Sequence, residues 1–130
     1  MNHKPKYKFF HRIYLAISGI VVAIIRERHL KYHILMGSLL IIPGIVISIP
    51  AAQIMALISI VGILITMELL NTAIELTVDL ATKQFSYRAK LAKDVASGAV
   101  LVTATLVLIL SIYIYSPFIS TLFTGASIGH

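Results

Sequence analysis

Apolar residues recur with a helical period along most of the chain, and two long apolar runs are free of charge. No residue between Lys31 and Glu68 carries a formal charge, and none after Asp94 does, apart from a possible charge on His130. A helix of about 20 apolar residues crosses the hydrocarbon of a bilayer. The pattern therefore predicts an all-α integral membrane protein.

The first helical pattern covers residues 7 to 28. Phe9, Ile13 and Ile17 lie on one stripe with basic residues to one side. This arrangement is typical of an amphipathic surface helix lying in the membrane interface. A signal peptide over residues 13–25 is the alternative. It is disfavoured because the apolar run ends in Arg26-Glu27-Arg28 and not in small residues suited to cleavage.

Three membrane-spanning helices are predicted to follow as part of one small domain. Pro43 predicts a kink within the first span, and Pro50 marks its end. The second span is about 30 residues long, so its last turns are expected to project beyond the membrane. The predicted spans and the outer tail cover residues 33–49, 51–81, 89–115 and 117–130.

Composition and charge support this topology. Hydrophobic residues make up 58% of the chain, charged residues 12%, and the mean hydropathy is +0.95. These values lie far outside the range of soluble domains. The net charge of +6 comes from basic residues clustered between Lys4 and Lys31 and between Lys83 and Lys93. Both clusters flank apolar spans, so the positive-inside rule places them and the N-terminus in the cytoplasm, and nucleic-acid binding is not expected.

Four polar residues in the second span share one helix face. Glu68, Asn71, Glu75 and Asp79 fall within an arc of roughly 80°. Polar residues can hold membrane helices together, but a charged carboxylate within the membrane costs several kcal/mol. Three acids on one stripe therefore favour a functional site. Glu68 comes about 25 Å after the outer end of its helix, close to the cytoplasmic edge of the hydrocarbon.

The spacing of these acids limits the chemistry that they can perform together. Glu68 and Glu75 lie about 10.5 Å apart along the helix, too far for both to hold one metal ion directly. Mg²⁺ prefers one or two carboxylates with water and substrate phosphates, so Glu75 could hold the ion with Glu27 as the second acid. His29 and His33 have a spacing that could bind metal, but interfacial packing is the favoured interpretation.

Two stretches of sequence resemble a known family. Residues 68–79 read ELLNTAIELTVD and residues 89–100 read AKLAKDVASGAV. Together they strongly resemble the prokaryotic diacylglycerol kinase family, which includes the undecaprenol kinases. The resemblance extends from about Tyr7 to Tyr115. It implies a homotrimer in the bacterial cell membrane that transfers the γ-phosphate of Mg·ATP to a lipid alcohol.

The resemblance also implies roles for individual residues. By this resemblance, Glu68 corresponds to the catalytic base of the family, which contacts the lipid substrate. Asn71 would orient the catalytic end of the site. Glu27 and Glu75 are expected to bind Mg²⁺, and Ser97 matches a position near the lipid substrate. The predicted ATP-binding residues are Lys8, Glu27, Glu75, Gln84, Ser86, Lys93 and Asp94.

Some alternatives stay open at this point. The run AKDVASGAV favours undecaprenol over diacylglycerol as the lipid, by a small margin. For Lys93-Asp94, a membrane anchor is as plausible as a nucleotide contact. A proton-coupled transporter or channel oligomer is the alternative function, since it would also use intramembrane carboxylates. That class predicts acids near the membrane midplane or on several helices.

Overall fold

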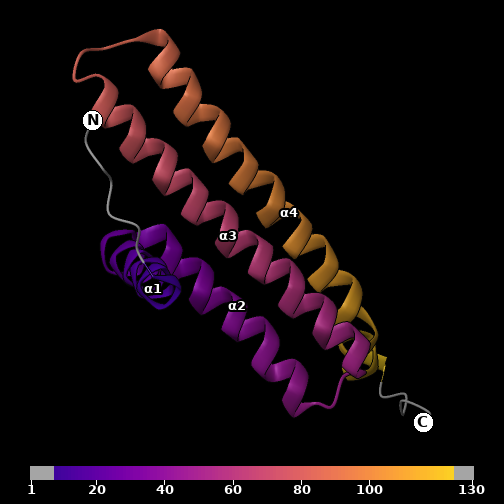
Figure 1. Cartoon of the computed structure of the whole chain (residues 1–130). Helices are drawn as coiled ribbons and strands as arrows, with labels where there is room; N and C mark the ends of the chain where they lie inside the picture. Colours follow the sequence, from indigo (N-terminus) through magenta and orange to yellow (C-terminus); the bar gives the residue numbers. More distant parts are fainter. Residues whose placement is uncertain (1–7, 125–130) are drawn as a thin grey trace.

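The structure is a computed structural model that describes residues 8–124, and it is entirely helical apart from short connections (Figure 1). The helices are α1 (Phe9–Arg26), α2 (Arg28–Val46), α3 (Ala51–Ala81) and α4 (Tyr87–Thr124). Each is long and apolar enough to cross a membrane. The prediction of an all-α fold is therefore confirmed, and the length and composition of the helices suit a membrane protein.

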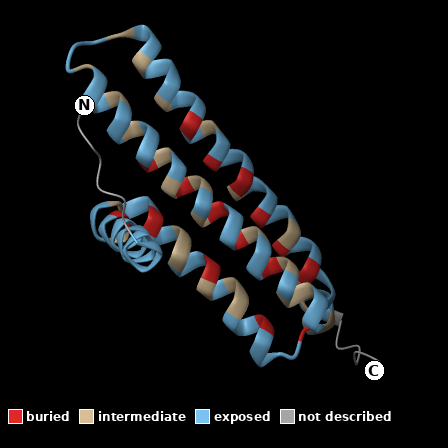
Figure 2. Cartoon of the chain, viewed as in Figure 1, coloured by how far each residue is buried: buried red, intermediate tan, exposed pale blue. Residues whose placement is uncertain are grey.

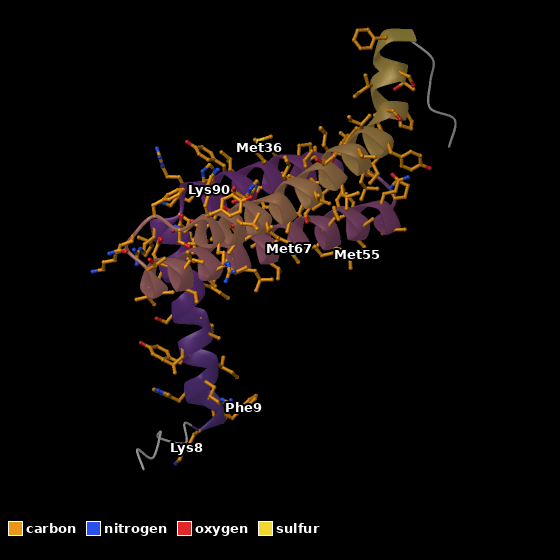
Figure 3. All side chains as sticks on the ribbon, turned by 90° about the horizontal axis from the view of Figure 1, so that it is seen from above. Lys8, Phe9, Met36, Met55, Met67 and Lys90 are labelled. Carbon is orange, nitrogen blue, oxygen red and sulfur yellow. The ribbon has the colours of Figure 1, made fainter. Side chains whose placement is uncertain are left out.

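Helices α2, α3 and α4 lie side by side with alternating directions and form a bundle. Helix α1 runs crosswise to them, so that Figure 1 shows it nearly end on and Figure 3 shows it from the side. Phe9 lies at its far tip, whereas Ala23, near its other end, is buried. Helix α1 thus contacts the bundle only near its C-terminal end.

A single extended residue separates α1 from α2. Glu27 has φ −94° and ψ 118°, and its N–H donates to the carbonyl of Ala23 at 2.8 Å. The ammonium of Lys31 donates to the carbonyl of Ile25 at 2.8 Å and places a cation at the C-terminus of α1, where the helix dipole favours one. Helix α2 therefore begins at Arg28, five residues before the predicted start of the first span at residue 33, and ends at Val46 instead of residue 49.

The core of the bundle lies where helices face one another, and the outward surface remains exposed (Figure 2). One cluster joins Val61 and Leu64 of α3 to Val100 and Val107 of α4. A second cluster near the α2–α3 turn contains Ile49, Leu57 and Ile114. The exposed surface is rich in large apolar side chains, as expected for helices that face lipid.

The α2–α3 turn is a Schellman motif. The N–H of Ser48 donates to the carbonyl of Ile45, and that of Ile49 donates to the carbonyl of Gly44. Ser48 has φ 58°, in the left-handed region that favours glycine. Pro50 follows and precedes the first residue of α3.

Helix α4 extends beyond the predicted third span. A tail was predicted from residue 117, but the helix continues through Pro117 to Thr124. A proline leaves the carbonyl four residues earlier without its helical partner. Here Ser116 Oγ donates to that carbonyl, on Tyr113, at 3.0 Å, which allows the helix to continue. The end of α4 bends away from the bundle (Figure 3). Residues 125–130 of the predicted tail lie outside the described residues.

Candidate active site

A small polar cavity lies between α2, α3 and α4, and we call it the polar cleft. It has a volume of about 220 Å³. Helix α3 contributes three members of the predicted stripe, α2 contributes two histidines and α4 contributes two residues. The lining residues are His29, His33, Glu68, Asn71, Glu75, Ser97 and Val100.

Glu68 is the buried acid of the polar cleft. It is 5% exposed, the only buried acidic residue within the described range 8–124. Its carboxylate Oε2 lies 3.8 Å from His33 Nε2 on α2. The side chain of His33 is 24% exposed, compared with 7% for that of Glu68, so His33 has more contact with solvent than the carboxylate beside it has. Glu68 is thus a shielded carboxylate with one titratable neighbour in contact.

Asn71 links two other polar residues of the cleft. Its Nδ2 donates to Glu75 Oε1 at 3.0 Å, and its Oδ1 accepts a long hydrogen bond of 3.4 Å from Ser97 Oγ. The donor and acceptor ends of the amide are therefore both used, which fixes its orientation. This chain joins α4 to α3 and holds one carboxylate oxygen of Glu75 in place.

A second cavity, which we call the loop cavity, lies where α3 and α4 meet at the connecting loop. Its volume is about 550 Å³. Lys93 Nζ lies 2.6 Å from Asp79 Oδ1 across the two helices. Three lysines against a single acid make the cavity cationic. It is lined by Val78, Asp79, Thr82, Lys83, Gln84, Phe85, Ser86, Ala89, Lys90 and Lys93.

The loop cavity and the polar cleft lie on adjacent turns of the same helix pair. Glu75 of the cleft precedes Asp79 of the loop cavity by four residues on α3, and Lys93 of the loop cavity precedes Ser97 of the cleft by four on α4. Four residues correspond to about 6 Å along a helix. The lysines of the loop cavity therefore lie about one helical turn from Glu75.

A third cavity, which we call the apolar groove, separates α1 from α3. It has a volume of about 780 Å³ and a mostly apolar lining that includes Gly19, Leu69 and Leu76. Glu27 lies at this groove and not at the polar cleft. The structure thus places the two predicted metal ligands, Glu27 and Glu75, in separate cavities.

Glu75 nevertheless suits a magnesium ion by its donor chemistry. Mg²⁺ takes one or two carboxylates together with water and phosphate oxygens, so it needs no dense cluster of protein ligands. Residues 8–124 contain no group of three or more His, Cys, Asp or Glu placed to hold a metal. The hydrogen bond from Asn71 orients the Glu75 carboxylate, as residues behind a metal ligand commonly do.

The predicted site residues therefore divide among several places. The polar cleft brings together Glu68, Asn71, Glu75 and Ser97, and the loop cavity brings together Gln84, Ser86 and Lys93. Lys8 lies at the tip of α1, away from the bundle (Figure 3). Asp94 is exposed and faces Lys90 at 3.8 Å. Lys8, Glu27 and Asp94 line neither the polar cleft nor the loop cavity. Contact with ATP stays a prediction for all of the predicted ATP-binding residues.

Sequence reasoning missed two features of this site. His29 and His33 line the polar cleft, whereas interfacial packing was the favoured interpretation. Their spacing of four residues places both on one helix face, but which face of α2 meets α3 depends on packing. Asp79 had no assigned partner, and the structure pairs it with Lys93.

Comparison with known proteins gives the chain its family. The sequence profile described as "Prokaryotic diacylglycerol kinase" matches residues 14–115. The undecaprenol kinase of Bacillus subtilis is 36% identical over 110 residues, covering 85% of this chain and 89% of that protein. The diacylglycerol kinase of Synechocystis sp. is 34% identical over 90 residues, 68% of this chain and 51% of that protein. The chain therefore belongs to the prokaryotic diacylglycerol kinase family and is a lipid kinase.

Proposed function

We propose that the enzyme transfers the γ-phosphate of magnesium-bound ATP to a membrane lipid alcohol, and that undecaprenol is its substrate in preference to diacylglycerol. The relative named undecaprenol kinase aligns over 89% of its own length, whereas the one named diacylglycerol kinase aligns over 51%. The run AKDVASGAV at residues 92–100 favours the same branch of the family.

The observation that carries the proposed chemistry is the buried Glu68 carboxylate beside a cationic cavity. Phosphoryl transfer requires that the phosphates are held and neutralised and that the attacking hydroxyl loses its proton. The lysines of the loop cavity supply the positive charge. Glu68, two turns deeper in the bundle than Glu75, is the acid placed to meet a hydroxyl that arrives from the lipid side.

The other residues have supporting roles in this mechanism. Lys93, with Gln84 and Ser86 beside it, binds the nucleotide in the loop cavity. Asn71 orients Glu75 and contacts Ser97, which lies near the lipid headgroup. Glu75 would hold Mg²⁺ at the polar cleft. Glu27, the other predicted carboxylate, lies at the separate apolar groove of the same chain, so its part in binding the ion stays a prediction. When bound, the ion neutralises charge on the β- and γ-phosphates.

A further part of the proposal is that the enzyme lies in the bacterial cell membrane. We propose that α2, α3 and α4 cross the bilayer while α1, which runs crosswise, lies in its interface. The start of α2 and the α3–α4 loop lie at the same end of the bundle. The basic residues near both would then face the cytoplasm, together with the N-terminus. ATP would reach the loop cavity from that side.

The active enzyme is proposed to be a homotrimer with sites shared between subunits. Helix α1 is almost wholly exposed in the single chain, and the residues along the polar cleft include the exposed His29 and Ser97. Polar groups at membrane depth are normally covered by protein. Neighbouring copies would provide that cover, and native mass spectrometry of the enzyme in detergent would give the number of subunits.

The transporter alternative has less support. It predicts acids near the midplane or on several helices, whereas Glu68, Glu75 and Asp79 all lie on the half of α3 that ends at the loop. Family membership also favours phosphoryl transfer.

The direct test is a phosphorylation assay. Purified enzyme in a bilayer is given labelled ATP, Mg²⁺ and either undecaprenol or diacylglycerol. We expect labelled lipid phosphate with both metal and lipid present, with a higher kcat/KM for undecaprenol. No labelled product with either lipid would contradict the proposed reaction, and a higher kcat/KM for diacylglycerol would contradict only the substrate preference.

A further inference from the structure

The polar cleft contains a residue that the proposed reaction has not used. His33 faces Glu68 from a different helix, with Nε2 at 3.8 Å from the carboxylate Oε2. This distance exceeds a direct hydrogen bond but is spanned by a small rotation of the ring or by one bridging water. His33 is also the more exposed of the two side chains.

A buried base needs a way to lose the proton that it gains. In the proposed reaction the lipid O–H bond breaks and its oxygen bonds to the γ-phosphorus, while the bond from that phosphorus to the bridging oxygen of ADP breaks. The proton of the hydroxyl is then on Glu68. It must leave before Glu68 can act in another turnover, and a carboxyl group this deeply buried has little direct contact with water.

The surroundings of His33 make it the group through which the proton can leave Glu68. Helix α3 presents Glu68 and Glu75 to the cleft, α2 itself adds His29 one turn earlier, and α4 adds only the uncharged Ser97 and Val100. Glu75 is held by Asn71 and is assigned to the metal. No other titratable side chain of residues 8–124 makes an ion pair or side-chain hydrogen bond with the Glu68 carboxylate.

We propose that His33 accepts from Glu68 the proton taken from the lipid hydroxyl and releases it to water in the polar cleft. This inference rests on the proposed function. His33 acts through Glu68 and touches neither the lipid nor the nucleotide. An imidazole suits this task because it gains and loses a proton readily near neutral pH.

The first test is the substitution His33→Gln, with Tyr32→Phe on the exposed neighbouring residue as the control. We expect kcat to fall about 10- to 100-fold in His33→Gln, less than the roughly 10²- to 10⁴-fold contribution of a group that acts directly on the reacting hydroxyl, because His33 acts through Glu68. The KM for ATP should change less than twofold, because the nucleotide site is untouched. Tyr32→Phe should keep the wild-type kcat. An unchanged kcat in His33→Gln would overturn the proposal.

Two further readouts separate proton transfer from a structural role. Added imidazole should restore kcat in a smaller variant, His33→Ala, and should not restore it in Glu68→Gln, where the carboxylate itself is missing. The deficit of His33→Gln should also shrink as the pH rises, because hydroxide can then take the proton from Glu68. A loss of kcat that is equal at every pH and insensitive to imidazole would assign His33 a structural role and overturn the proposal.

A measurement without turnover distinguishes this inference from the proposed function. The ring signals of His33 in labelled enzyme, followed by NMR, should shift in Glu68→Gln and stay in place in Thr105→Ala, a change on the exposed face of α4. If wild-type enzyme phosphorylates no lipid but the ring signals respond to Glu68, the reaction is wrong while the contact is real. Ring signals that do not shift in Glu68→Gln would overturn the His33 proposal, even if the wild-type enzyme is an active kinase.

Discussion

The bundle of α2, α3 and α4 uses its polar residues differently at its two ends. At the end with the α3–α4 loop, polar side chains bond to one another between helices: Ser97 to Asn71, and Lys93 to Asp79. At the end with the α2–α3 turn, hydroxyl groups bond to backbone carbonyls, as Ser111 does to Val107. The loop end leaves side-chain oxygens and ammonium groups available to a ligand.

This contrast has a physical basis. A hydroxyl that bonds to the carbonyl four residues earlier is satisfied within its own helix and can face lipid or core at little cost. An ionised carboxylate has no hydrogen to donate to a backbone carbonyl, so at membrane depth it needs donors from other side chains or from ligands, as Glu75 takes one from Asn71. The loop end is therefore built for binding and the turn end for packing, and four changes test this difference.

The largest effect is expected from Glu68→Gln. The amide keeps the size of the side chain but cannot take a proton from a hydroxyl, so kcat should fall roughly 10²- to 10⁴-fold. The KM for ATP should stay within about threefold of the wild-type value. Lipid phosphorylation at saturating ATP measures the first effect, and ATP titration measures the second.

The matched control for Glu68→Gln is Ser111→Ala, which changes a buried polar residue at the turn end. Because Ser111 Oγ bonds only within α4, its loss should leave kcat within about twofold of wild type. Turnover that survives Glu68→Gln, or that collapses in Ser111→Ala, would break the contrast between the two ends.

Glu75→Gln should affect binding more than chemistry. An amide is a poor ligand for Mg²⁺, and even residues behind a metal ligand typically change affinity 10- to 100-fold, so the KM for Mg·ATP should rise by at least roughly tenfold. Raising the Mg²⁺ concentration should recover part of the loss. The opposite pattern, a lower kcat at unchanged KM, would move Glu75 from the metal to the reacting hydroxyl.

Much of the loop end of the bundle could be predicted from the sequence. The period of Glu68, Asn71 and Glu75 placed them on one face, and the structure brings them to one cleft. The pairing of Asp79 with Lys93 follows from the same logic once the α3–α4 loop is known. Two antiparallel helices joined by a short loop bring together residues equally far from it, and these two lie about seven residues on either side of Ser86.

Other features depend on information that periodicity lacks. His33 joined the site because α2 packs on α3 with that face inward, which is a property of the tertiary contact and not of the α2 sequence. The continuation of α4 through Pro117 depends on a Ser116 hydroxyl that replaces the missing N–H. From the sequence alone, Pro117 predicted the end of the helix, because the side chain of the preceding residue is not usually expected to donate the hydrogen bond that proline cannot.

The contact between α2 and α3 gives the third test, on stability. A Cβ at Gly37 would overlap Val61 Cγ1, whereas one at Gly62 meets nothing within 4 Å. Gly37→Ala should therefore lower the free energy of unfolding by about 1–3 kcal/mol, as overpacking does. Gly62→Ala should leave it unchanged or raise it by up to about 1 kcal/mol, because alanine favours the helix.

Thermal unfolding of both glycine variants in the same detergent measures this difference. The Gly37→Ala variant should also lose kcat, since the contact of α2 with α3 sets the place of His33 beside Glu68. Equal stability of the two variants would mean that α2 and α3 separate more easily than the Gly37 contact implies.

The smallest expected effect lies in the turn, where the substitution Ser48→Gly should stabilise the protein. Ser48 has φ 58°, which a residue with a Cβ adopts at a cost of about 1 kcal/mol and glycine adopts freely. The gain is partly offset by the greater freedom of glycine in the unfolded chain, so we expect the free energy of unfolding to rise by about 0.5 kcal/mol, with a small rise in Tm.

The same change at Ser59, an exposed position inside α3, should have the opposite sign, because glycine is a poorer helix former than serine. Neither variant should change kcat, since both positions lie outside the polar cleft and the loop cavity. A loss of stability in Ser48→Gly would show that Ser48 contributes a side-chain contact to the turn that outweighs its backbone strain.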